Sequence, residues 1–188
     1  MLRVVTMVYG GLVNKNIVAQ LQTRGGNALG LTGADMDVVR SHKREVKDVD
    51  YGFVGDVDTV DGSRLADLIE SGVVPVMAPL THDGKGNILN TNADTIASET
   101  AKALSAYYDV TLVYAFEKAG VLADSDDEGS VIRCLDKEKF EKYVADGTIA
   151  GGMLPKLENA FAAIKVGVKR VAITKDTDLE VRCGTMIE

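Results

Sequence analysis

The feature that most constrains this chain is an unbroken apolar run, VVPVMAPL at residues 73–80. A strand with one face in water alternates apolar and polar residues, whereas a continuous apolar run is typical of a strand covered on both faces. Such a strand needs helices on either side of its sheet. The sequence supplies them, because apolar residues recur at helical spacing over 4–22, 61–71, 92–107, 136–144 and 154–166.

Further strands are predicted between these helices, at 27–31, 111–116 and 168–174, with a hairpin-like pair at 36–41 and 51–60. Helices that alternate with apolar strands predict an α/β fold, a three-layer αβα sandwich around a mainly parallel sheet. The 188 residues are enough to bury a sizeable core, and they contain no linker, low-complexity segment or repeat. A single domain over residues 1–188 is therefore expected.

Composition excludes several classes of function. A formal net charge of −7, spread along the chain, disfavours nucleic acid as a partner. Cys134 and Cys183 lie far apart without the spacing of zinc ligands, and no apolar run reaches the roughly 18 residues of a membrane span. His42 and His82 stand in polar surroundings and are expected to be exposed, which disfavours histidine-based catalysis. We therefore expect a cytoplasmic protein with no membrane partner and no protein-bound metal.

The first constellation with possible chemistry is the segment Asn90-Thr91-Asn92-Ala93-Asp94, between a turn and a helix. In an α/β sheet, ligands gather where strands end and helices begin, so short polar side chains there can line a binding crevice. The same residues also suit a helix start, with Asn92 as the cap and Asp94 favoured by the helix dipole. Spacing alone leaves both interpretations open.

The second constellation is Gly151-Gly152-Met153-Leu154-Pro155-Lys156, at the start of a helix. Glycines let the backbone approach a ligand, and N–H groups of a first helical turn attract phosphate. Lys156 is disfavoured by the helix dipole unless a polyphosphate is bound beside it. A solvated surface lysine remains an equally good interpretation. The sequence contains no GxxxxGK[ST] or GxGxxG motif, so a nucleotide site here would be of another kind.

Taken together, eight segments resemble in order the N-acetylglutamate kinase branch of the amino-acid-kinase family. They are VNK at 13–15, ALGLTGAD at 28–35, YGFVGDV at 51–57, VVPVMAPL at 73–80, ILNTNADTIA at 88–97, GVL at 120–122, GGMLPKLENA at 151–160 and GTMI at 184–187. The two constellations are among them. The resemblance implies the sandwich fold of that family, and it runs through nearly the whole chain.

The resemblance also implies an activity: transfer of the γ-phosphoryl group of ATP, with Mg²⁺, to the side-chain carboxylate of an N-acylated glutamate in arginine biosynthesis. By the same resemblance, Lys156 would stabilise the transferring phosphoryl group and Asp94 would orient the catalytic lysines. Asn90 and Asn92 would bind the amino-acid substrate, and the protein would be a homo-oligomer. The residues that match the nucleotide segment are Glu117, Lys118, Ala119, Gly120, Val121, Leu122, Thr148, Ile149, Ala150, Gly152 and Met153.

The chain departs from the family pattern at three places. One is the region between Val171 and Gly184, which is shorter than the family's usual helix-containing stretch. The family's Lys-Gly-Gly motif, its glycine-rich loop and its substrate-gripping arginine would lie upstream of Met1, so the chain corresponds to the C-terminal two-thirds of a member. Glu117 follows Phe116 where the nucleotide segment usually opens with an aspartate. The alternatives are a non-catalytic nucleotide-binding remnant, or a kinase that acts on N-succinylglutamate or another amino acid.

Overall fold

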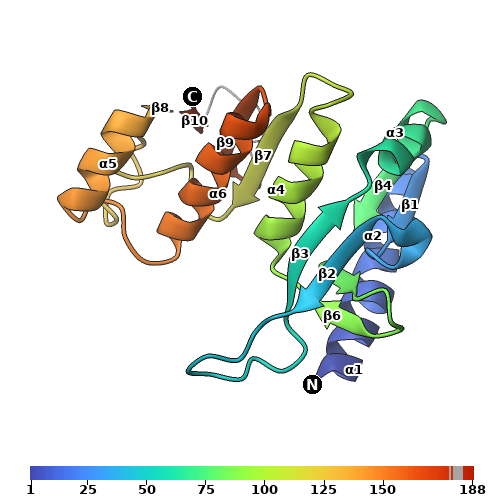
Figure 1. The fold of residues 1–188 in the computed structure, drawn as a ribbon. Helices are drawn as coiled ribbons and strands as arrows, with labels where there is room; N and C mark the ends of the chain where they lie inside the picture. The colour runs from blue at the N-terminus through green and yellow to red at the C-terminus, as the bar shows by residue number, and fades with distance from the viewer. Residues whose placement is uncertain (178, 180–183) are drawn as a thin grey trace. The chain divides into compact units, whose positions relative to one another are not determined.

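The computed structural model describes residues 1–177, 179 and 184–188 (Figure 1). Contacts group the residues into two compact units, unit 1 with Met1–Tyr107 and unit 2 with Tyr108–Glu188. Each unit is described by itself, and the single domain over 1–188 stays a prediction. Cys183 lies outside the described residues, whereas Cys134 is exposed as a free thiol.

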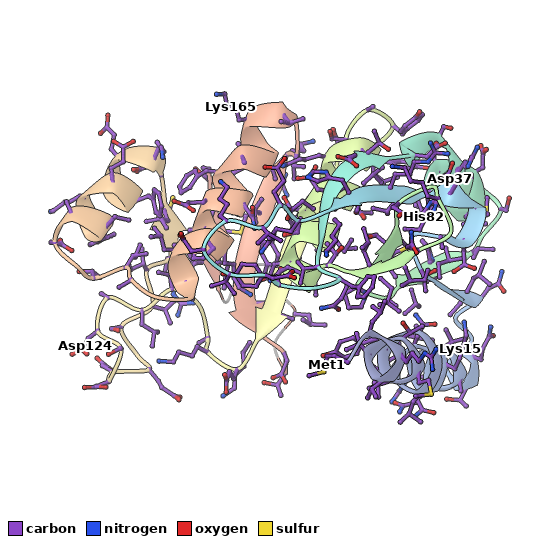
Figure 2. The ribbon with its side chains drawn as sticks, turned by 60° about the horizontal axis from the view of Figure 1, so that its bottom comes forward. Met1, Lys15, Asp37, His82, Asp124 and Lys165 are labelled. Atoms are coloured by element: carbon purple, nitrogen blue, oxygen red, sulfur yellow. The ribbon has the colours of Figure 1, made fainter. Side chains whose placement is uncertain are left out.

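Unit 1 begins with one long helical stretch, as the spacing over 4–22 predicts. It consists of α1 (Leu2–Val5), a π-helical segment η1 (Thr6–Val13) and α2 (Asn14–Thr23). Gly25, with φ of +80°, allows the left-handed turn that follows the helix. Figure 2 shows this helix nearly end-on, with Met1 and Lys15 on it.

Two small sheets follow in unit 1. In the first, β1 (Ala28–Leu31) pairs in parallel with β4 (Val74–Met77). The second has four strands in the order β3-β2-β5-β6. The β2–β3 and β5–β6 pairs are antiparallel and the β2–β5 pair is parallel. The bounds are β2 (Val39–Lys43), β3 (Gly55–Val60), β5 (Leu80–His82) and β6 (Ile88–Asn90), with a short 3-10 turn η2 (Asp35–Asp37) before β2.

The apolar run at 73–80 does not form the single doubly covered strand that the sequence predicts. It splits after Met77, and Leu80 begins a strand of the other sheet. Pro79, which has no N–H to donate, lies in the break, whereas Pro75 lies within β4 opposite Leu29. Val74 is 48% exposed, which places part of the run on the surface of unit 1.

Two helices complete unit 1, α3 (Gly62–Glu70) and α4 (Ala93–Leu104). Asp61 caps α3 by accepting a hydrogen bond from the Arg64 backbone N–H. Both helices bury their apolar faces in one cluster, because Leu65 of α3 and Ile96 of α4 pack with the neighbouring strand residues. The other members of this core are Val38, Val39, Val57, Val60, Met77 and Leu104.

Unit 2 is one four-stranded sheet in the order β7-β9-β10-β8, with two helices. β7 and β9 are parallel, β10 and β8 are parallel, and β9 and β10 are antiparallel. In β9 the four residues 171–174 are all buried, so the strand covered on both faces is here. The bounds are β7 (Thr111–Phe116), β8 (Cys134–Leu135), α5 (Lys137–Ala145), α6 (Met153–Val166), β9 (Arg170–Lys175) and β10 (Thr185–Ile187).

The predicted fold class is confirmed: the chain is α/β, with helices and mixed, mostly parallel sheets. Both strands and both helices that the sequence predicts for unit 2 are present, while β8 and β10 were not predicted. No helix among residues 1–177, 179 and 184–188 is long and apolar enough to cross a membrane.

Candidate functional site

The segment with the most predicted site residues follows the carboxyl end of β7 in unit 2. β7 pairs in parallel with β9, and the chain leaves the sheet at Phe116 to form residues 117–122. In Figure 1, β7, β9 and α6 lie side by side in this unit. The carboxyl end of parallel strands is the usual place for a ligand crevice in an α/β sheet.

A pocket of about 230 Å³ lies at this end of unit 2. Eight of the eleven residues that the sequence predicts to contact a nucleotide line it, whereas Glu117, Ala119 and Gly152 are not among its lining residues. Ser125 also lines it and was not predicted. The full lining is Lys118, Gly120, Val121, Leu122, Ser125, Thr148, Ile149, Ala150 and Met153.

Gly120 and Thr185 hold the first wall of this pocket in place. The backbone N–H of Val121 donates to the buried hydroxyl of Thr185 at 2.8 Å. A Cβ at Gly120 would lie 2.7 Å from that hydroxyl oxygen and 2.9 Å from Val131 Cγ1, so only glycine fits there. Thr185 belongs to the GTMI segment, but the sequence alone gives no sign that it supports this wall.

The second wall is the turn from 146 to 153. Asp146 accepts hydrogen bonds from the side chain and the backbone N–H of Thr148, the latter at 3.0 Å, and they hold the pKa of the Asp146 carboxyl below its usual value. Gly151 follows with φ of +59°, a left-handed conformation that favours glycine. Gly152 then starts α6 without a side-chain cap, which suits a helix N-terminus that faces a ligand.

The chemistry of this pocket suits part of a nucleotide. Its walls are mainly apolar, from Val121, Leu122, Ile149 and Met153, and Lys118 supplies a positive charge. Lys118 Nζ donates to the Ser125 carbonyl at 3.2 Å, so the ammonium is tied to the loop opposite. The volume lies below the roughly 300–1,000 Å³ of pockets that enclose whole drug-sized ligands. The pocket can therefore enclose only part of such a ligand.

Lys156 lies in the first turn of α6, half-buried, and its ammonium stands over an aromatic ring of β7. Lys156 Nζ is 5.1 Å from the centroid of the Tyr114 ring. A cation over a ring face within about 6 Å of the centroid is attracted by the ring quadrupole. The lysine is therefore held at the sheet side of α6, which favours a positioned ammonium over a freely solvated one.

The other predicted residues lie in unit 1, where a pocket of about 410 Å³ is bordered by the N-terminal helix and by residues 76–79. Asn90 and Thr91 line this pocket, together with Asn14 of α2. Asn90 is held by its backbone N–H, which donates to the Phe53 carbonyl at 2.8 Å. It also borders a second pocket of about 570 Å³, which is lined by Arg3, Tyr51 and Phe53 among others.

Asn14 fixes the wall of the 410 Å³ pocket. Its Nδ2 donates to the Val76 carbonyl at 2.8 Å, and a Cβ at Gly30 would lie only 1.8 Å from its Oδ1. Lys15 Nζ donates to the Gly30 carbonyl at 2.9 Å. Asn14 and Lys15 together join α2 to both strands of the β1–β4 sheet. The VNK segment therefore has a structural role in unit 1.

Asn92 and Asp94 are not among the residues that line either pocket. Asn92 Oδ1 accepts from the Thr95 backbone N–H at 3.1 Å and so caps α4, and Asp94 lies in the first turn of that helix. The capping interpretation of this segment is therefore confirmed for Asn92. It does not decide the binding role, because a capping side chain can also contact a ligand.

Within the part of the chain that the structure describes, no group of three or more His, Cys, Asp or Glu side chains is placed to hold a metal ion. The two histidines hydrogen-bond with aspartates instead. His42 Nδ1 is 2.6 Å from Asp58, and His82 Nε2 is 2.8 Å from Asp37, a pair that Figure 2 labels. The His82 side chain is only 16% exposed, so its expected exposure was wrong.

Comparison with known proteins gives a consistent result. The model of the amino acid kinase family matches residues 1–175. Among curated proteins, the acetylglutamate kinase of Bacteroides thetaiotaomicron is 70% identical over 187 residues, which is 100% of this chain and 73% of that protein. Another relative, the acetylglutamate kinase of Parabacteroides distasonis, is 61% identical over 99% of this chain and 73% of its own length.

Among solved structures, smu.665 from Streptococcus mutans UA159 aligns with a TM-score of 0.80 at 28% identity, over 97% of this chain and 69% of that one. N-acetylglutamate synthase from Neisseria gonorrhoeae, in complex with coenzyme A and N-acetyl-glutamate, aligns with a TM-score of 0.82 at 20% identity. That alignment covers 97% of this chain and 42% of the other. At this identity the likeness shows the fold alone.

Proposed function

The chain belongs to the amino acid kinase family, and from this premise we propose that it acts as an acetylglutamate kinase in arginine biosynthesis. The reaction is attack of a side-chain carboxylate oxygen of N-acetylglutamate on the γ-phosphorus of ATP. The bond from that phosphorus to the β–γ bridging oxygen breaks, and ADP leaves. The observation that carries the nucleotide half is the pocket of unit 2, on which eight of the predicted residues converge.

The nucleotide base occupies the 230 Å³ pocket in this proposal, against Val121, Leu122 and Met153. The phosphates extend toward the start of α6, where Gly151 and Gly152 allow close approach of the backbone. N–H groups of a first helical turn and the helix dipole both favour phosphate there. The absence of a side-chain cap on α6 supports this placement.

Lys156 neutralises charge on the transferring phosphoryl group. Phosphoryl transfer needs little covalent chemistry from the protein, because positioning and electrostatic stabilisation supply most of the rate enhancement. The described residues include no group of three or more His, Cys, Asp or Glu that could hold a metal ion, so a Mg²⁺ ion would enter together with ATP rather than occupy a site made by the protein alone. Such an ion would supply positive charge that offsets the charge of the phosphates.

The amino-acid half of the proposal belongs to unit 1. Asn90 binds N-acetylglutamate at the 410 Å³ pocket, Asn92 contacts the substrate from the adjoining start of α4, and Asp94 orients the catalytic lysines. The position of Asn90 between two pockets supports its part, since one amide can bind both the carboxylate and the acylated nitrogen of the substrate. The proposal also includes one domain over residues 1–188, a homo-oligomer and a cytoplasmic location, where ATP is supplied.

Two substitutions test the halves separately, by calorimetric titration of the 188-residue chain with MgATP and with N-acetylglutamate. Met153→Arg fills the base pocket and should remove ATP binding, while N-acetylglutamate binding stays. Asn90→Ala should weaken N-acetylglutamate binding by about 10-fold or more, the cost of an unpaired buried polar group. Asn87→Ala, in an exposed turn of the same unit, is the control. ATP binding that survives Met153→Arg unchanged would exclude the proposed base pocket.

A further inference from the structure

We propose that Tyr114 is a positioning residue for Lys156: its ring holds the ammonium in the place from which it meets the phosphates of ATP. This inference rests on the proposed function, because it assumes that Lys156 acts on the phosphates. Tyr114 belongs to no segment in which the sequence predicts site residues. It lies on β7, two positions before the strand ends and three before the nucleotide segment at 117–122 begins.

The ring of Tyr114 is a fixed platform. Tyr114 is 4% exposed, and it pairs in the parallel ladder with Ile173 of β9, which is fully buried. Leu112, two positions earlier, is also buried, so the same face of β7 is covered along its length. A ring that is held by a strand on one side and by core packing on the other cannot move away when a ligand binds.

Lys156 is anchored at the other end of its side chain. The next residue, Leu157, is fully buried, which fixes this turn of α6 against the sheet. The lysine must then place its charge near a helix N-terminus, which the helix dipole disfavours. The negative face of the Tyr114 ring, at 5.1 Å, offsets that repulsion and selects one side-chain conformation from the many that a lysine can adopt.

The consequence for the reaction is preorganisation. A charge that is already in place before the phosphates arrive loses less conformational freedom when it binds them, and it stabilises the transition state without reorganisation. Unit 2 has another lysine over aromatic rings, Lys137 over Phe140 and Phe161 at 4.8 and 5.4 Å. Lys137 is an exposed residue of α5 and is not among the lining residues of the pocket, so it provides a matched control.

The test compares MgATP with AMP, since AMP lacks the phosphates that Lys156 would meet. Tyr114→Leu, which removes the ring, should lower the affinity for ATP relative to AMP by about 5- to 30-fold, the range of a cation–π contact of roughly 1–2 kcal/mol. Tyr114→Phe, which keeps the ring, should leave this ratio within about twofold. Lys137→Met should also leave it unchanged.

Two further experiments, a double-mutant cycle and a series of fluorinated rings at position 114, distinguish a positioning role of the ring from a packing role. Lys156→Met alone should lower the ratio, and adding Tyr114→Leu to it should lower the ratio no further. Fluorinated phenylalanines at position 114 keep the shape of the ring and weaken its negative face, so the ratio should fall stepwise with each added fluorine. This series keeps the test valid even if Tyr114→Leu does not fold.

Four outcomes would overturn the inference. A ratio that is insensitive to fluorination would mean that the ring acts only by packing. An equal loss in Tyr114→Phe would assign the effect to the hydroxyl. If Lys156→Met leaves the ratio unchanged, the proposed role of Lys156 fails and the positioning role fails with it. If Lys156→Met lowers the ratio and the ring variants do not, only the positioning role fails.

Discussion

The two units treat their predicted ligand-binding residues differently. In unit 2, residues from 118–122 and 148–153, far apart in the sequence, converge on one pocket. In unit 1, three neighbouring polar residues separate: Asn90 lines two pockets, Asn92 caps α4, and Asp94 lies in the first turn of that helix. The segments of unit 2 that were predicted from their backbone and apolar residues line one common pocket in the fold. Short polar side chains have local structural uses that compete with binding.

The units also differ in how their sheets are buried. In unit 2, β9 is buried over residues 171–174, and Leu157, Ala160 and Ala163 of α6 are buried as well. In unit 1, the two-stranded β1–β4 sheet leaves Leu29 and Val74 partly in solvent. Unit 2 is therefore built on a strand covered on both faces, whereas unit 1 includes a two-stranded, partly exposed sheet that Asn14 and Lys15 join to α2.

The largest expected effect breaks the nucleotide half alone. Lys156→Met should reduce phosphoryl transfer by about 10²- to 10³-fold, the typical loss when one donor to a developing charge is removed. Binding of N-acetylglutamate in unit 1 should stay unchanged. Lys165→Met, in the last turn of the same helix, is the matched control and should retain activity. Initial rates at saturating substrates give the comparison, and a Lys156→Met rate close to that of Lys165→Met would refute the role of Lys156.

The next effect breaks the amino-acid half alone. Gly30→Ala places a Cβ 1.8 Å from Asn14 Oδ1, so either the Asn14 side chain gives up its hydrogen bond to Val76 or α2 shifts from the β1–β4 sheet. Overpacking of this kind costs about 1–3 kcal/mol in the free energy of unfolding. Gly11→Ala, where a Cβ meets nothing within 4 Å, is the control and should not destabilise the protein. Urea unfolding measures both, and ATP affinity in unit 2 should not change in either variant.

A smaller effect resolves the role of Asn92. Asn92→Ala removes the α4 cap and should cost about 1 kcal/mol of stability. Asp136→Ala, which removes the equivalent cap of α5 in unit 2, should cost a similar amount. If Asn92 also binds substrate, its variant alone raises KM for N-acetylglutamate. An unchanged KM together with the loss of stability would leave Asn92 as a cap and nothing more.

The smallest expected effect is a pH dependence of the free energy of unfolding, which arises from the β2–β3 hairpin of unit 1. The hydrogen bond to Asp58 raises the pKa of His42 above its usual 6.5. A raised pKa means that the stabilisation is complete below about pH 6.5 and is lost as the pH rises through the folded-state value. His42→Gln should remove this slope from urea unfolding measured between pH 5.5 and 8.5. A slope that persists in that variant would assign it to another group.

The sequence predicted the elements and the family correctly where a residue pattern is compatible with a single structure. The helical spacing at 154–166 and the strand at 168–174 are confirmed, and so is the family, since its motifs occur in order through the chain. The prediction of one doubly covered strand at 73–80 was wrong, because the apolar residues of this run are divided between two sheets. Contacts between distant segments leave no local signal in the sequence. Examples are the hydrogen bond from the Val121 N–H to the Thr185 hydroxyl and the cation–π contact between Lys156 and Tyr114.

The central claim is phosphorylation of N-acetylglutamate by ATP, and hydroxylamine trapping tests it most directly. The assay uses residues 1–188 joined to the part of the Bacteroides thetaiotaomicron relative that they do not match. The account predicts an acyl hydroxamate that requires both MgATP and N-acetylglutamate and that is lost with Lys156→Met. Tight ATP binding without any hydroxamate, or equal hydroxamate from unacylated glutamate, would contradict it.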